Sequence, residues 1–157
     1  MATWIDHART DYAAGDSCPT ARATFLRERN DLLYELPIQV EFIEATTQVV
    51  TPYTSVVTFD IFVPGYAAGA NLKAVIEAHV DAGSGDFRLF NSTHSVDGTE
   101  VTGITAVAYE DAPEASLAIA DGQANQLVTF GVKAKIDNGA NTMFVRNLDR
   151  LTFWFEV

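Results

Sequence analysis

The sequence predicts a mainly β protein: an antiparallel β-sandwich, or jelly roll, preceded by a short N-terminal helical arm. Three observations support this prediction. Before Pro37 the apolar residues repeat at helical spacing, after Pro37 they alternate with polar residues, and turn-forming residues separate the alternating runs. We therefore divide the 157 residues into an arm at 1–37 and a sandwich domain at 38–157.

The arm contains one predicted helix, from Thr20 to about Leu36. Pro19 suits the first helical position, where its missing N–H costs nothing, and Pro37 ends the helix. A segment of 37 residues is too short to bury a core of its own, so its apolar side chains require a partner surface. We expect the assembly anchor to consist of Trp4, Ile5, Phe25, Leu26, Leu32, Leu33 and Leu36.

The sandwich domain contains eight or nine predicted strands. Each alternating run buries one face and leaves the other in water, as in antiparallel sheets. Turns such as Pro64-Gly65 and Asp137-Asn138-Gly139 separate the runs. The runs cover 38–42, 57–63, 72–80, 87–89, 128–136 and 151–157, with weaker strands near 104–109, 115–119 and 142–146. We expect the core to include Ile76, Phe130, Val132, Phe153 and Phe155.

Acidic residues dominate the charge of the chain. The formal net charge at pH 7 is −11; residues 1–37 hold four basic and six acidic residues, and residues 38–157 hold six and fifteen. Such a surface repels phosphate backbones and anionic lipid, so we expect neither a nucleic-acid partner nor a membrane partner.

The cysteine content and the first residues indicate where the chain is made. Cys18 is the single cysteine, which excludes an intrachain disulfide. The first residues lack the basic and apolar regions of a signal peptide. No apolar run reaches the roughly 18 residues of a membrane-spanning helix. We therefore expect synthesis and folding in a cytoplasm.

The residue types that usually carry chemistry form no known motif. The histidines have no metal-ligand spacing, and we interpret His79 and His94 as solvated surface residues. Cys18 has no neighbouring histidine or second cysteine, and GxSxG, P-loop and dinucleotide motifs are absent from the sequence. We predict no catalytic residue, no metal and no cofactor, and hence no enzyme. For the acidic loop 81–86, a calcium site stays open as the alternative to an ordinary turn.

Three aromatic side chains fall out of phase with the buried residues of their strands: Phe62, Phe90 and Trp154. Three interpretations stay open for them. Exposed rings can stack on sugars, they can form a subunit interface, or the arm can bury them on the second face of the sheet.

Two segments resemble parts of tailed-bacteriophage virion proteins. The stretch from Pro19 to Glu35 resembles a segment near the N-terminus of such proteins that precedes a β-sandwich. Within it, Leu26-Arg27-Glu28-Arg29-Asn30 matches a Leu-Arg-Asp-Asn pattern, with Glu28 in place of the usual Asp and Arg29 inserted. The ending from Phe144 to Val157 is similar to the last strand pair of these sandwiches.

The resemblance implies a structural component of the virion, such as a head fibre, head decoration, neck or tail-fibre protein. It also implies assembly with itself, with a homotrimer as the first expectation, and with other virion proteins. The chain would be made in the host cytoplasm and then reside in the virion. The alternative function is a carbohydrate-binding or adhesin module that recognises a host glycan.

Overall fold

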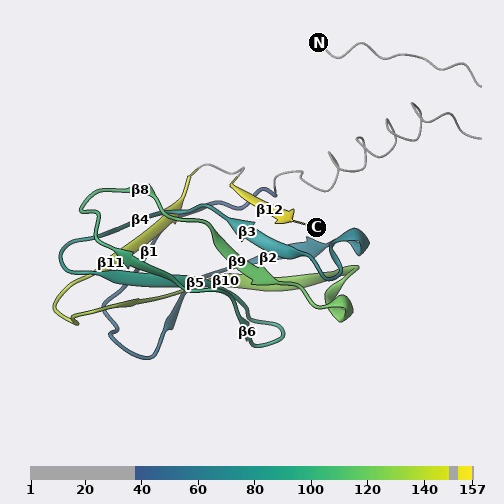
Figure 1. Ribbon diagram of the computed structural model, residues 1–157, viewed down its shortest axis with the longest axis horizontal. Helices are drawn as coiled ribbons and strands as arrows, with labels where there is room; N and C mark the ends of the chain where they lie inside the picture. Colours follow the sequence, from purple (N-terminus) through teal and green to yellow (C-terminus); the bar gives the residue numbers. More distant parts are fainter. Residues whose placement is uncertain (1–37, 149–151, 157) are drawn as a thin grey trace, which may run out of the picture. The chain divides into compact units, whose positions relative to one another are not determined.

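The computed structural model describes residues 38–148 and 152–156, and this part of the chain is mainly β (Figure 1). It contains twelve strands in antiparallel sheets, and no α-helix occurs among the described residues. Correspondingly, no helix in this part is long and apolar enough to cross a membrane.

The predicted arm lies outside the described residues, so its helix stays a prediction. The same holds for Cys18 and for the proposed anchor side chains Trp4, Ile5, Phe25, Leu26, Leu32, Leu33 and Leu36.

One layer of the fold is a five-stranded sheet. The strand order is β2–β10–β5–β6, and β7 also pairs with β5. The strand β10 lies in the centre, because it pairs with β2 on one side and with β5 on the other. The bounds are β2 (Thr54–Val63), β5 (Gly85–Asn91), β6 (Val96–Asp97), β7 (Val101–Ile104) and β10 (Gln126–Ile136).

The remaining strands form two sheets, in the orders β1–β11–β4–β8 and β12–β3–β9. Their bounds are β1 (Phe42–Thr47), β3 (Asn71–Ala74), β4 (Glu77–Val80), β8 (Glu110–Asp111), β9 (Ala115–Ala118), β11 (Met143–Asn147) and β12 (Phe153–Glu156). Two short 3-10 turns, η1 (Gly65–Ala67) and η2 (Asp121–Gln123), follow β2 and precede β10.

These two sheets continue each other across an interruption at Val75 and Ile76. The buried residues of β3 and β4 keep one phase through it, from Leu72 to Val80. At the interruption, the Val75 N–H donates to the Thr152 carbonyl at 3.0 Å. The prediction of one strand at 72–80 is therefore right about the buried face. It is wrong about the continuity of the strand, because the backbone at Val75 and Ile76 forms hydrogen bonds with irregular segments and not with a neighbouring strand.

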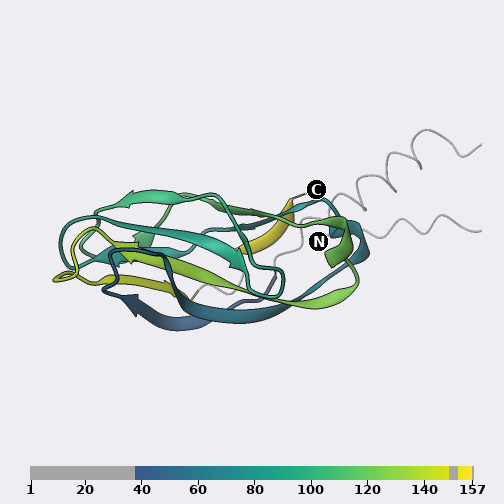
Figure 2. The ribbon, with the colours of Figure 1, turned by 90° about the horizontal axis from the view of Figure 1, so that it is seen from below.

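A single core joins the sheets, which lie in two stacked layers (Figure 2). The Phe59 ring of β2 contacts Phe42 of β1 and, edge to face at 5.2 Å, Phe153 of β12. Burial of this apolar surface is the main stabilising contribution to such a fold. All five predicted core residues are buried, which confirms the predicted buried faces: Ile76 at the interruption, Phe130 and Val132 on β10, and Phe153 and Phe155 on β12.

Two of the three weaker predicted strands are confirmed, as β9 and β11, and the third needs correction. A strand near 104–109 is wrong, because β7 ends at Ile104 and β8 begins only at Glu110. In the segment 96–111 the strands are two to four residues long, and so short a run shows no clear alternation.

Candidate functional site

Phe62 and Leu127 form an exposed apolar pair on the outer face of the five-stranded sheet. Phe62 of β2 lies directly opposite Leu127 of β10, and the two residues are 57% and 64% exposed. Their neighbours Val63 and Val128 point into the core, as the period of two requires. Phe62, which falls out of phase with the buried residues of its strand, therefore has an exposed ring. Its neighbour Leu127 is not among the residues predicted from the sequence.

Phe90 corrects one of the sequence interpretations, because it is buried and only 5% exposed. It lies opposite Gly131 of β10, where the missing side chain leaves room for the Phe90 ring. The Lys133 ammonium covers the ring at 4.7 Å from its centroid. Phe90 therefore offers no ring face to a sugar or to a second subunit, and it packs against Gly131 and Lys133 of its own sheet.

Trp154 lies in a different sheet and is half-buried. It sits on β12, opposite Lys73 of β3, whereas Phe62 sits on β2 in the other layer. The structure therefore does not bring Phe62, Phe90 and Trp154 together into one aromatic platform.

A network of paired charges covers the same outer face as Phe62 and Leu127. The Asp97 carboxylate lies 2.7 Å from both the Arg88 guanidinium and the Lys133 ammonium. The Asp86 carboxylate lies 3.3 Å from the Lys135 ammonium. The Tyr53 ring lies between two of these cations, 4.2 Å from the Arg88 guanidinium and 4.4 Å from the Lys135 ammonium. Every basic side chain on this face thus has a carboxylate partner within the molecule.

On the other layer, Tyr109 crosses the whole sheet β1–β11–β4–β8. It precedes the edge strand β8, and its hydroxyl donates to Glu44 on the opposite edge strand β1 at 2.7 Å. On the way its ring lies 3.7 Å from the Arg146 guanidinium and meets His79 edge to face at 4.3 Å. Burial, together with the hydrogen bond to Glu44, raises the pKa of Tyr109 to about 12.

His79 corrects the interpretation as a solvated surface histidine. Its ring stacks parallel on Phe144 of the neighbouring strand at 4.3 Å. Its Nδ1 is buried and has no hydrogen-bond partner among the described residues. His94, in contrast, is exposed, as expected from the sequence.

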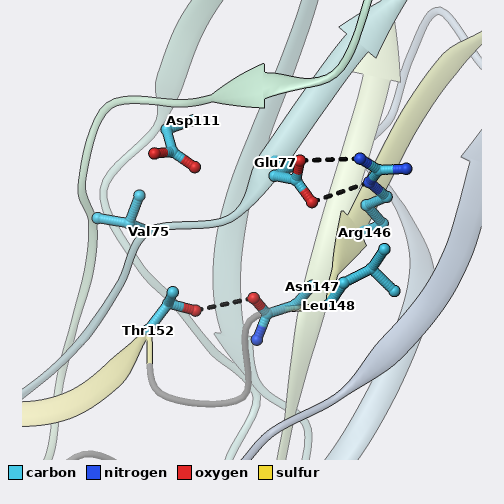
Figure 3. Close-up of a pocket in the computed structure, with 7 residues that line it drawn as sticks. All are labelled: Val75, Glu77, Asp111, Arg146, Asn147, Leu148 and Thr152. Atoms are coloured by element: carbon cyan, nitrogen blue, oxygen red, sulfur yellow. Dashed lines mark hydrogen bonds and ion pairs between the residues drawn. The ribbon is translucent and has the colours of Figure 1, made fainter.

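A pocket of about 500 Å³ opens at the interruption between the two sheets (Figure 3). Glu77 binds Arg146 on one wall through two hydrogen bonds, of 2.8 and 2.9 Å, and this contact holds the pKa of Glu77 below its usual value. The Asn147 side chain is held by two hydrogen bonds. Its Nδ2 donates to the Val40 carbonyl, and its Oδ1 accepts a hydrogen bond from the Thr152 hydroxyl. The lining residues are Val75, Glu77, Asp111, Arg146, Asn147, Leu148 and Thr152.

The acidic loop at 81–86 directs its carboxylates to structural partners. Asp81 accepts the Thr142 N–H at 2.7 Å, and Asp86 accepts the Gly103 N–H at 3.0 Å. The first of these bonds lowers the pKa of Asp81. These contacts agree with an ordinary acidic turn. Within 38–148 and 152–156, no three His, Cys, Asp or Glu side chains gather closely enough to hold a metal ion.

Sequence reasoning missed the partners that make these sites. Leu127 lies just before the predicted run 128–136, within β10, and only the register with β2 shows that it faces Phe62. Tyr109 shows no alternation with its sequence neighbours, and its contacts come from three different strands, β1, β11 and β4. A signal for the pocket was absent from the sequence, because three chain segments meet there.

The described residues thus define a mainly β protein of several antiparallel sheets, with an exposed apolar pair on the outer face of one layer and a pocket of mixed polar and apolar lining on the other layer. Comparisons of the chain with protein-family models and with curated proteins find no match.

Proposed function

We propose that this protein is a non-enzymatic structural component of a tailed-phage virion. In this proposal the arm at 1–37 attaches the chain to the capsid, neck or tail, and the β domain is a jelly roll that makes contacts between subunits of a homotrimer. The chain is made in the host cytoplasm and resides in the virion.

The observation that carries the proposal is the exposed pair of Phe62 and Leu127. Two large apolar side chains directly opposite each other expose a continuous apolar surface, and apolar surface gains about 25 cal/mol per Å² when a partner covers it. Such a pair on a sheet face that otherwise carries paired charges favours an assembly contact. The resemblance of 19–35 and 144–157 to virion proteins supports the same class of function.

Deletion of residues 1–36 tests the role of the arm. We expect the deleted protein to keep the β signal in circular dichroism and to lose incorporation into phage particles, because the anchor side chains are gone. Full-length protein expressed in the same infected cells is the control. An aggregated deletion product would show that the arm covers the β domain, and normal incorporation would contradict an anchoring role.

A carbohydrate-binding module is the second candidate, and the pocket at the sheet interruption favours it. Its lining combines carboxylates, a guanidinium and a hydroxyl with the apolar side chains of Val75 and Leu148. Sugar sites commonly combine polar groups with apolar surface in this way.

Asp111 is the residue to change in a test of glycan binding. It lines the pocket, and no hydrogen bond or ion pair of its side chain occurs among the described residues. If the pocket binds a host glycan, Asp111→Asn will weaken retention on host-cell envelopes, whereas Asp137→Asn, outside the pocket, will not. Equal retention of both variants would count against this candidate.

A further inference from the structure

We infer that the outer face of the sheet β2–β10–β5–β6 packs against the same face of a second copy of this chain. The inference deepens the proposed function and rests on its claim of subunit contacts. A contact between two identical faces is twofold, so it joins chains in pairs and is separate from the threefold contacts of the proposed homotrimer. It names the face, the partner and the side chains at the centre of the contact.

The apolar pair identifies the face. Phe62 and Leu127 lie on neighbouring strands of one sheet, so a single partner surface can cover both. Two other highly exposed apolar residues, Ile43 and Val107, lie outside this sheet, on β1 and in the segment before β8. Ile43 lies between the buried Phe42 and Glu44, and Val107 lies between two alanines, so neither adjoins a second exposed apolar side chain in the sequence.

The charges of this face allow a second copy to approach. Its three basic side chains, Arg88, Lys133 and Lys135, are each paired with a carboxylate of the same face. Two further carboxylates belong to the balance: Asp60 accepts a hydrogen bond from the Thr129 hydroxyl at 2.6 Å, and Glu100 lies 3.8 Å from Arg88. Because the charges are nearly balanced within the face, two copies of it meet with little net repulsion.

The opposite layer lacks this balance. Among the described residues its basic side chains are Lys73 and Arg146, and each is already bound by carboxylates. Acidic side chains are in excess there: Glu44, Glu77, Asp111, Glu114 and Glu156. In a protein of net charge −11, two such layers repel each other, so charge selects the five-stranded sheet for contact between copies.

The size of the face suits a small contact between subunits. The strands β2, β10, β5 and β6 contain 10, 11, 7 and 2 residues, and each residue covers about 3.3 Å along its strand and about 4.8 Å across the sheet. These dimensions give on the order of 500 Å² per copy, which is below the roughly 800 Å² that a standard interface buries on each partner and in the range of weaker contacts.

Substitution of Leu127 tests the contact in the full-length protein. We expect sedimentation analysis to show an oligomer for the unchanged chain, and Leu127→Lys to weaken self-association at least about tenfold, because a charge then lies at the centre of the contact. Ile43→Lys is the matched control: Ile43 is 78% exposed but lies on the other layer, so its change will leave association intact. Because both residues are exposed, both variants should keep their melting temperatures.

Thiol labelling gives a second measurement that is independent of charge. In a Cys18→Ser background, Phe62→Cys will react more slowly than Ile43→Cys, and the difference will disappear on dilution to the monomer. Three results overturn the inference: a chain that is monomeric at high concentration, loss of association in Ile43→Lys alone, or equal labelling of the two thiols. Incorporation of Leu127→Lys into particles, measured in parallel, tests the proposed function separately, because a virion role can persist where this contact fails.

Discussion

Two neighbouring groups lie so close to Gly131 that they leave no room for a side chain. A Cβ atom there would overlap the Val57 carbonyl oxygen and lie 2.6 Å from the Phe90 ring. The glycine thus explains why an aromatic residue in a solvent-facing phase is buried. The sequence alternation reports which face of the sheet a side chain takes. It does not report whether the neighbour across the strand leaves a hollow that the side chain fills.

Gly131→Ala tests this packing. We expect it to destabilise the fold by about 1–3 kcal/mol, because overpacking forces the backbone of β2 or the Phe90 ring to move. The urea midpoint measures the loss. Gly122→Ala is the control, since a Cβ at Gly122 has no neighbour within 4 Å among the described residues and its midpoint should barely change. Equal midpoints for the two variants would show that the sheet adapts without cost.

At the scale of secondary-structure elements, Tyr109 connects the two edges of the sheet β1–β11–β4–β8. Its hydroxyl reaches Glu44 on β1, while its ring covers Arg146 and His79 on the strands between. A hydrogen bond of this kind contributes about 0.5–1.5 kcal/mol. The phenol is needed in its protonated form, because only that form donates to the carboxylate.

Tyr109→Phe should therefore lower stability by about 0.5–1.5 kcal/mol at pH 8. The pKa of Tyr109 is raised to about 12 in the folded state from an ordinary value of 10.0. The stabilisation is thus fully present below pH 10 and is lost as the pH rises towards 12. In urea titrations at pH 8 and 11, the difference between wild type and variant should shrink at the higher pH. A difference that grows with pH would contradict this assignment.

Much of this β architecture follows from alternation in the sequence, and the limits of that signal are physical. The long run 128–136 and the ending at Phe153 and Phe155 are strands with the predicted faces buried. The run 72–80 also keeps its buried face, but alternation does not encode the interruption at Val75. The site depends on register: Glu77 meets Arg146, and Phe62 meets Leu127, only through pairing between distant segments.

At the scale of the whole molecule, one core holds both layers. Phe153 is fully buried and contacts Phe59 from the other layer. Phe153→Ala should cost about 3–5 kcal/mol, the usual range for a buried phenylalanine. Phe62→Ala, on the exposed face, should change the free energy of unfolding by less than about 0.5 kcal/mol in the dilute monomer. Denaturant titration of both variants checks this contrast, and a large loss for Phe62→Ala would mean that the monomer itself uses that ring.

The pairing of all basic side chains has a colloidal consequence. In the described residues every lysine and arginine lies within 4 Å of a carboxylate, so the uncompensated charge on this surface is entirely negative. A particle that displays many copies would carry a continuous anionic coat, and suspended particles would repel one another. Because such repulsion extends only about 8 Å at physiological ionic strength, added salt would bring particles together long before it unfolds the protein.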